Sequence, residues 1–121
     1  MATLLIADDD AGFRGSIRRV LERDPDTTVI GEAADGEEAV RLAKALHPKI
    51  VLMDITMPQM NGLEALRLTK EALPDTKVIV VTIHDDEPYR AVAMAGGADG
   101  FILKKALATE LLPTIRRVTS H

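Results

Sequence analysis

The sequence predicts an α/β fold, a five-stranded parallel sheet with helices on both faces, forming one domain over residues 1–121. Two observations carry this prediction. Five short apolar runs alternate along the chain with amphipathic helical patterns, which implies parallel strands joined by right-handed crossovers. The central run, residues 50–53 (IVLM), contains no polar residue, as is typical of a strand buried on both faces.

The first half of the chain contains the first three predicted strands, at residues 3–7, 28–30 and 50–53, of which the second is weak enough to form an edge. The first helix carries an apolar stripe and ends at Pro25, and the second starts at an Asp35 cap and ends at His47-Pro48. The residues expected to face the sheet are Phe13, Ile17, Val20 and Leu21 in the first helix, and Ala39, Leu42, Ala43 and Leu46 in the second.

The second half contains strands at residues 77–81 and 100–103 and three further helices. The third helix starts near Gly62 and stops at Pro74, and the fourth follows a cap at Asp85 or Asp86 and ends at Gly96-Gly97. The residues expected to face inward are Leu63, Leu66 and Leu73 in the third helix, and Tyr89, Val92 and Ala93 in the fourth.

The last helix is striped by Leu107, Leu111, Ile115 and Val118. Pro113 lies within this stretch, where a proline removes one backbone donor and clashes with the preceding turn. We therefore expect either a helix that begins late, with Thr109 near its N-cap, or a kinked helix.

Composition excludes several classes of protein. The formal net charge is −4 and there are three aromatic residues, which argues against nucleic-acid binding by this domain itself. No apolar run approaches the ~20 residues of a membrane span, and the N-terminus lacks a signal-peptide pattern. The absence of cysteine excludes disulfides and thiolate metal sites and suits a cytoplasmic protein.

Polar residues follow four of the five predicted strands: Asp8, Asp9 and Asp10 the first, Asp54 the third, Thr82 the fourth and Lys104 the fifth. Ligands and chemistry gather beyond the carboxyl ends of strands in open α/β sheets. The pattern therefore predicts that these carboxylates, the hydroxyl and the ammonium share one rim.

Carboxylates that share a rim repel one another, by about 3 kcal/mol per pair at ~5 Å and an effective dielectric constant near 20. Mg²⁺ relieves such repulsion through oxygen ligands. Lys104 and Thr82 suit an anion that arrives at the metal, and Asp54 is a candidate nucleophile, since carboxylates form aspartyl phosphates. These are parts for phosphoryl transfer.

Four stretches, LIADDDAGFR, VLMDITMPQMNG, VIVVTIHDDEPY and GADGFILKK, resemble the receiver domain of bacterial two-component response regulators over essentially the whole chain. The last two are most similar to the NarL/FixJ (LuxR-type) regulators. The resemblance implies a flavodoxin-like three-layer sandwich with strand order 2-1-3-4-5. It also implies that a sensor histidine kinase phosphorylates Asp54.

The resemblance further assigns the metal ligands. Asp9 would bind Mg²⁺ directly and Asp8 mainly through water, with Asp54 and the Thr56 backbone carbonyl as further ligands. This frame is preferred to one based on Asp9 and Asp10 because it places Phe13 and the following arginine where the family has a Phe-Arg pair.

The resemblance also implies a switch. Thr82 and Lys104 would contact the phosphoryl oxygens, and Phe101 would swing inward when Thr82 moves. The protein would catalyse only its own phosphorylation and dephosphorylation and would not be an enzyme that turns over a metabolite. Relatives of this type usually control a DNA-binding effector domain, and homodimerisation on phosphorylation is a further hypothesis.

Ile83 departs from the family pattern, because the residue after the switch threonine is often small. A β-branched side chain is stiff at χ1, so we expect Ile83 to shield the acyl phosphate.

Three alternatives remain open at this point. The D-x-D pattern of Asp8 and Asp10 fits a phosphohydrolase of the haloacid-dehalogenase type, although the chain is too short for its cap domain and Asp54 would go unexplained. A pseudo-receiver that only binds partners, and a flavodoxin-like nucleotide binder, are the other two. Each polar group taken alone also has a structural explanation, and His84 is interpreted as a loop residue and not as a metal ligand.

Overall fold

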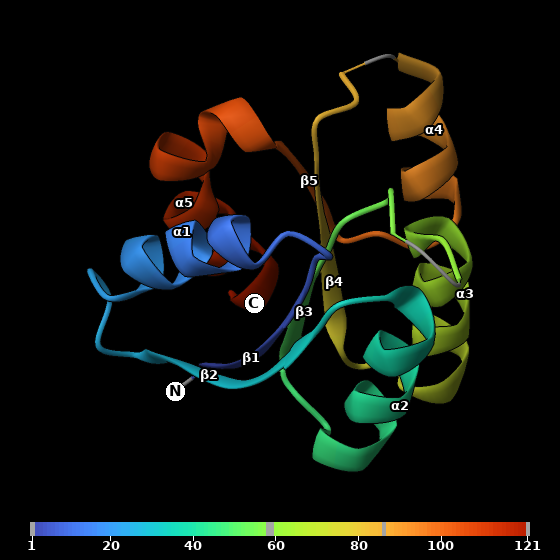
Figure 1. Ribbon diagram of the computed structural model, residues 1–121, viewed down its shortest axis with the longest axis horizontal. Coiled ribbons are helices and arrows are strands. Elements are labelled where there is room, and N and C mark those ends of the chain that lie inside the picture. The colour runs from blue at the N-terminus through green and yellow to red at the C-terminus, as the bar shows by residue number, and fades with distance from the viewer. Residues whose placement is uncertain (1, 58–59, 86, 121) are drawn as a thin grey trace.

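The computed structural model describes residues 2–57, 60–85 and 87–120 (Figure 1). Within these ranges, five strands alternate with five helices, and a short 3₁₀ turn, η1, precedes the last helix. The elements are β1 (Ala2–Ala7), α1 (Ala11–Leu21), β2 (Thr27–Ala33), α2 (Gly36–Leu46), β3 (Ile50–Met53), α3 (Gly62–Ala72), β4 (Lys77–Thr82), α4 (Glu87–Ala95), β5 (Gly100–Leu103), η1 (Lys104–Ala106) and α5 (Leu107–Thr119). Among the described residues, no helix is both long enough and apolar enough to cross a membrane.

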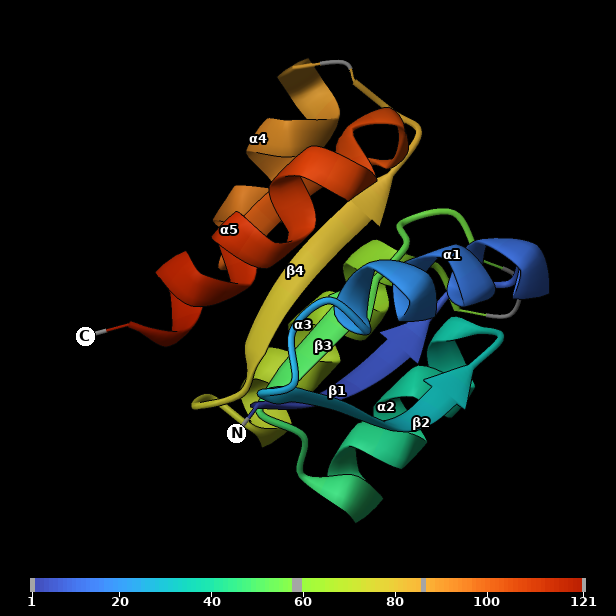
Figure 2. The ribbon, with the colours of Figure 1, turned by 90° about the vertical axis from the view of Figure 1, so that its left-hand side faces the viewer.

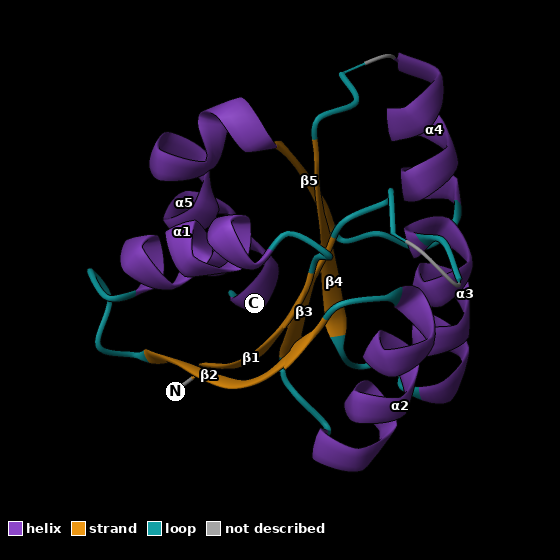
Figure 3. Ribbon diagram, viewed as in Figure 1, coloured by secondary structure: helices purple, strands orange, loops and turns teal. Residues whose placement is uncertain are grey.

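The five strands form one parallel sheet in the order β2-β1-β3-β4-β5, which confirms the predicted topology. Helices α1 and α5 cover one face of this sheet, and α2, α3 and α4 cover the other (Figures 1 and 3). Figure 2 shows β2 at one edge, as its weak apolar signal predicted. The observed β2 is longer than the predicted strand at residues 28–30.

The core consists of two layers, one on each side of the sheet. Successive residues of a strand point to opposite faces, so the apolar runs of the inner strands feed both layers. The layer beneath α1 and α5 receives Leu4, Ile6, Ile50, Leu52, Ile79 and Val81 from the sheet. The layer beneath α2, α3 and α4 receives Leu5, Ala7, Val51, Met53, Val78 and Val80. Burial on both faces therefore explains the unbroken apolar run of β3.

Two residues expected to face inward are on the surface instead: Leu46 is 38% exposed and Val92 is 54% exposed. The buried stripe of α2 includes Val40, which the prediction omitted, and this moves the centre of the stripe away from Leu46. In α4 the buried residue is Ala93, and Val92 lies about 100° around the helix from it. Periodicity had located these helices correctly but not the centre of each buried stripe.

Of the two alternatives for the last helix, the late start is wrong, and the kink at Pro113 stays a prediction. Helix α5 begins at Leu107, directly after η1, and Pro113 lies inside it. Because proline has no backbone N–H, the carbonyl one turn before Pro113 loses its partner within the helix. Pro113 is exposed, so this carbonyl lies on the solvent side of the helix, where water can bond to it. The predicted apolar stripe of this helix is buried as expected.

The predicted cap of α4 is corrected in part. The helix begins at Glu87, so Asp85 lies too far upstream to be its N-cap, and the alternative, Asp86, lies outside the described residues. The predicted cap at Asp35 is present, since its side chain accepts the Glu38 N–H. Asn61, which was not predicted as a cap, caps α3 by accepting the Glu64 N–H.

Gly62 holds the start of α3 against the end of β3. Its N–H donates to the carbonyl of Ile55 over 2.7 Å. A Cβ atom at this position would lie 1.9 Å from the carbonyl oxygen of Asp54, which is backbone and cannot move aside cheaply. Close approach of two backbone segments therefore requires glycine here.

We expect Gly62→Ala to lower the free energy of unfolding by about 1–3 kcal/mol, the range for overpacking a tight site. Gly15→Ala is the matched control, because the nearest atom to its Cβ would be 3.7 Å away, on a flexible arginine. Alanine in the middle of α1 should raise the free energy of unfolding by about 0.5–1 kcal/mol. Urea denaturation measures both, and a Gly62→Ala protein as stable as the parent would contradict the packing described.

Candidate functional site

The carboxyl ends of four neighbouring strands form one rim of the sheet. Asp8 follows β1, Asp54 follows β3, Thr82 ends β4 and Lys104 follows β5. Because these strands are adjacent and parallel in the order β1-β3-β4-β5, the four residues emerge at the same edge.

Three carboxylates converge at this rim. Asp8, Asp9 and Asp54 can each offer one oxygen such that all three oxygens lie within 4.8 Å of one another. Asp8 and Asp54 are only 2% and 4% exposed, whereas Asp9 is exposed. Asp10 has a different role, since its Oδ1 accepts the N–H groups of Gly12 and Phe13 and so caps α1. The geometry thus separates Asp8 and Asp9, at the rim, from Asp10.

The Lys104 ammonium bridges the two buried carboxylates. Its Nζ lies 2.8 Å from Oδ2 of Asp8 and 3.2 Å from Oδ2 of Asp54. It also lies 4.3 Å from the centroid of the Phe13 ring. Burial by itself would lower the pKa of Lys104, but the two carboxylates outweigh it and hold the pKa above its ordinary value.

Asp54 is expensive to ionise in this surrounding. Burial raises the pKa of its carboxyl above the ordinary value, and the neighbouring Asp8 carboxylate adds to the rise. The Thr56 N–H, which donates to Oδ1 of Asp54 over 3.1 Å, and the Lys104 ammonium offset only part of it. A further cation at the rim would favour the ionised form.

The donor set fits a hard divalent cation. All three converging groups are carboxylates, and they outnumber the single ammonium beside them. Oxygen ligands with an excess of negative charge are what Mg²⁺ selects in proteins. The predicted fourth ligand, the Thr56 backbone carbonyl, follows Asp54 by two residues, and its role stays a prediction.

Two loops are joined beside Asp54 through His84. The hydroxyl of Thr82, which is fully buried, accepts the His84 N–H over 3.2 Å. Nε2 of His84 forms a hydrogen bond of 2.8 Å with the Thr56 hydroxyl, and the imidazole stacks on Tyr89 with centroids 4.3 Å apart. Sequence reasoning treated His84 as a simple loop residue. In the sequence, the one indication that His84 lies at this site is that it follows Thr82 by two residues.

Ile83 and Phe101 lie at the border of the site. Ile83, between Thr82 and His84, is 70% exposed. Phe101, on β5, is partly buried against the core, and the guanidinium carbon of Arg90 lies 5.4 Å from its ring centroid. Their assigned roles in access and switching stay predictions.

Arg14 supports the acidic loop from α1. Its guanidinium donates to the Asp8 carbonyl over 2.5 Å and pairs with Glu32 of β2 over 2.7 Å. Glu32 also pairs with Arg18, and these two arginines outweigh burial and lower the pKa of its carboxyl. Sequence analysis missed this contact because it depends on how α1 packs against β2.

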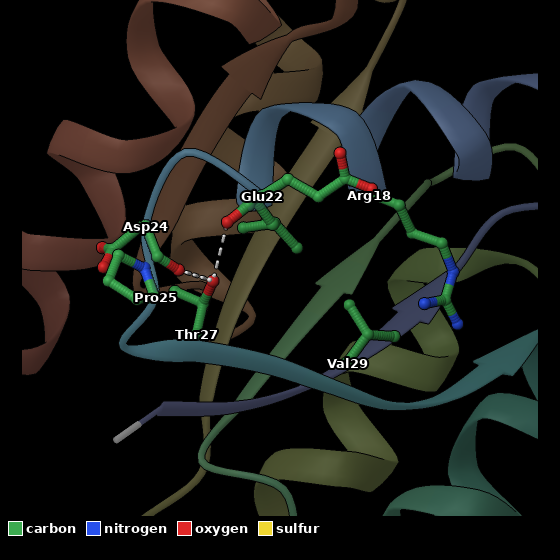
Figure 4. A pocket seen from close by; sticks show the side chains of 7 residues that line it. Arg18, Glu22, Asp24, Pro25, Thr27 and Val29 are labelled. Atoms are coloured by element: carbon green, nitrogen blue, oxygen red, sulfur yellow. Dashed lines mark hydrogen bonds between the residues drawn. The ribbon is translucent and has the colours of Figure 1, made fainter.

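A separate hollow lies near the other end of the strands, where β2 begins, and Figure 4 shows residues that line it, among them Arg18, Glu22, Thr27 and Val29. The Thr27 hydroxyl donates to the carbonyls of Leu21 and Asp24 there, over 3.1 and 2.9 Å. These hydrogen bonds close the connection between α1 and β2, which is a structural role.

Comparison with known proteins places this chain in a family. Residues 4–116 match the response regulator receiver domain. The chain is 40% identical over 115 residues to the transcriptional regulatory protein DegU of Brevibacillus brevis, which covers 95% of this chain and 49% of DegU. It is 34% identical over 119 residues to the nitrate/nitrite response regulator protein NarL of Escherichia coli, covering 98% of this chain and 55% of NarL. The chain thus spans about half the length of these curated relatives.

The fold comparison agrees. The crystal structure of a two-component response regulator of the LuxR family from an Aurantimonas species superposes with a TM-score of 0.92 at 33% identity, covering 98% of this chain and 84% of that one. These matches confirm the resemblance inferred from the four motifs and leave the phosphohydrolase and nucleotide-binding alternatives without support. The protein belongs to the response regulator receiver domain family, and its similarity extends to the NarL and LuxR type of regulator.

Proposed function

We propose that this domain is a phosphorylation-controlled switch that accepts a phosphoryl group from a sensor histidine kinase on Asp54. The observation that carries the proposal is the sharing of one ammonium, Lys104, between the buried carboxylates of Asp8 and Asp54. Of these two carboxylates, Asp54 is the one that follows the central strand. The shared ammonium therefore lies beside Asp54, at the point where an incoming phosphoryl group would add negative charge.

The proposed transfer is a displacement at phosphorus. An Asp54 oxygen forms the new O–P bond while the bond from phosphorus to the donor's histidine nitrogen breaks, and that histidine leaves with the electron pair. Lys104 moves its hydrogen bond from Asp54 to a phosphoryl oxygen. Bound Mg²⁺, held by Asp8, Asp9, Asp54 and the Thr56 carbonyl, would neutralise charge on the phosphoryl oxygens.

The proposed readout begins at Thr82. Its hydroxyl now accepts the His84 N–H. In the phosphorylated protein it would donate to a phosphoryl oxygen instead, and Phe101 would move inward into the space that opens. The surface formed by β4, α4, β5 and α5 would then shift between two populations.

The names of the relatives extend the proposal to the whole protein. DegU is a transcriptional regulatory protein and NarL a response regulator, and this chain spans about half of each. We infer that the domain acts in the cytoplasm and controls a DNA-binding effector without binding nucleic acid itself. It catalyses only its own phosphorylation and dephosphorylation. We further propose that phosphorylation produces a homodimer. Sedimentation with and without beryllofluoride and Mg²⁺ tests this, and an unchanged sedimentation coefficient would count against a dimer.

Intact-mass analysis tests the phosphorylation site. After incubation with acetyl phosphate and Mg²⁺ the protein should gain the mass of one phosphoryl group, with acetate as the leaving group. The Asp54→Asn variant should gain none, because the amide is not a nucleophile at this position. Equal phosphorylation of the variant would overturn the assignment of Asp54.

Magnesium binding should depend on Asp9 and not on Asp10. Mg²⁺ at about 100 times its dissociation constant should raise the free energy of unfolding by about 2.7 kcal/mol. Asp9→Asn removes a predicted ligand charge and should abolish most of this gain. Asp10→Asn is the matched control, because asparagine caps helices as well as aspartate does. A larger loss in Asp10→Asn than in Asp9→Asn would show that the acidic pair is assigned to the wrong residues.

Ile83→Ala should accelerate both phosphorylation by small donors and hydrolysis of the acyl phosphate, because a stiff side chain beside the switch threonine is removed. Ile83 is 70% exposed, so the variant should unfold at nearly the urea concentration of the parent. Rates of phosphoryl gain and loss, followed by mass, measure the effect. Identical rates in the two proteins would show that Ile83 does not control access.

A further inference from the structure

The surroundings of the Lys104 ammonium are the starting point. Its side chain is 17% exposed, and three groups contact the ammonium among the described residues: the Asp8 carboxylate, the Asp54 carboxylate and the face of the Phe13 ring. The ring belongs to the first turn of α1 and the two carboxylates to the rim of the sheet.

The proposed function changes two of these three contacts. Asp54 gives one oxygen to the new bond with phosphorus, and Asp8 is a predicted metal ligand, so the charge that each presents to Lys104 falls during the reaction. The Phe13 ring takes part in neither event. Its attraction for a cation is therefore the one contact of this ammonium that the chemistry leaves intact.

Local structure fixes the ring in place. The Asp10 carboxylate accepts the N–H groups of Gly12 and Phe13 over 2.9 and 3.3 Å and so anchors the start of α1. Phe13 also packs against the buried layer beneath α1 and α5. The ring centroid lies 4.3 Å from the ammonium nitrogen, inside the ~6 Å range over which an aromatic face attracts a cation.

We propose that Phe13 is a positioning residue for phosphoryl transfer: its ring holds the Lys104 ammonium in the site while Asp8 and Asp54 are engaged by the metal and the phosphoryl group. The inference rests on the proposed function. Phe13 contacts the Lys104 ammonium, so it is expected to act on phosphoryl transfer through Lys104.

Variants of Phe13 separate this role from simple packing. Phe13→Leu keeps an apolar side chain but removes the aromatic face, and Phe13→Tyr keeps the face. Val20→Ala is the packing control, because Val20 lies in the same buried layer of α1, away from Lys104. Each protein is tested for the rate of Asp54 phosphorylation by acetyl phosphate, for Mg²⁺ affinity by calorimetry and for urea denaturation.

We expect Phe13→Leu to phosphorylate roughly 3- to 30-fold more slowly, the range that cation–π energies allow, with Mg²⁺ affinity unchanged. Phe13→Tyr should restore the rate. Val20→Ala should be destabilised yet phosphorylate at the parental rate. A normal rate in Phe13→Leu, or an equal loss in Val20→Ala or Phe13→Tyr, would overturn the inference while the proposed function stands. If the parent protein gains no phosphoryl group on Asp54, the proposed function itself fails.

Nuclear magnetic resonance gives a readout that does not depend on activity. A methylene group beside a ring face is shifted by the ring current, so the Lys104 side-chain protons should move when Phe13 is replaced by leucine. In the parent protein this ring-current shift should persist after addition of Mg²⁺ and beryllofluoride, which mimics the acyl phosphate. Loss of the shift on addition would show that Lys104 leaves the ring, and the inference would be wrong.

Discussion

Two buried carboxylates that share one ammonium are the constraint on which this structure depends. Asp8 and Asp54 are almost fully buried, and burial raises the pKa of Asp54. An isolated buried carboxylate is strongly unfavourable unless a cation pairs with it, and Lys104 pairs with both. One ammonium does not balance the three carboxylates at the rim, so the site is set up to take a further cation.

The fold brings these groups together by its topology. Parallel strands in the order β1-β3-β4-β5 deliver a residue each to one edge, and helices cover both faces of the sheet. Gly62 allows α3 to start directly against the Asp54 carbonyl, and Arg14 bonds to the Asp8 carbonyl from α1. These contacts hold the backbone of Asp8 and Asp54, while the contact between His84 and Thr56 joins the two loops beside Asp54.

Sequence patterns predicted the elements and their order well, because burial on two faces leaves a strong periodic signal in strands such as β3. They did not locate the centre of the buried stripe in α2 and α4, where Leu46 and Val92 are exposed, since tertiary packing decides which flank of an apolar stripe is buried. The contact of Phe13 with Lys104 has no signal in the sequence. It joins residues far apart in the chain and depends on how the start of α1 lies relative to η1, which begins at Lys104.

We propose above all that the Lys104 ammonium, which pairs with the Asp54 carboxylate, also binds an incoming phosphoryl group. A crystal structure of the protein with Mg²⁺ and beryllofluoride tests it most directly. We expect beryllium bonded to an Asp54 oxygen, Lys104 within hydrogen-bond distance of a fluorine, and the metal among Asp8, Asp9 and Asp54. Beryllofluoride bound elsewhere, or a Lys104 that turns away from Asp54 in the complex, would contradict it.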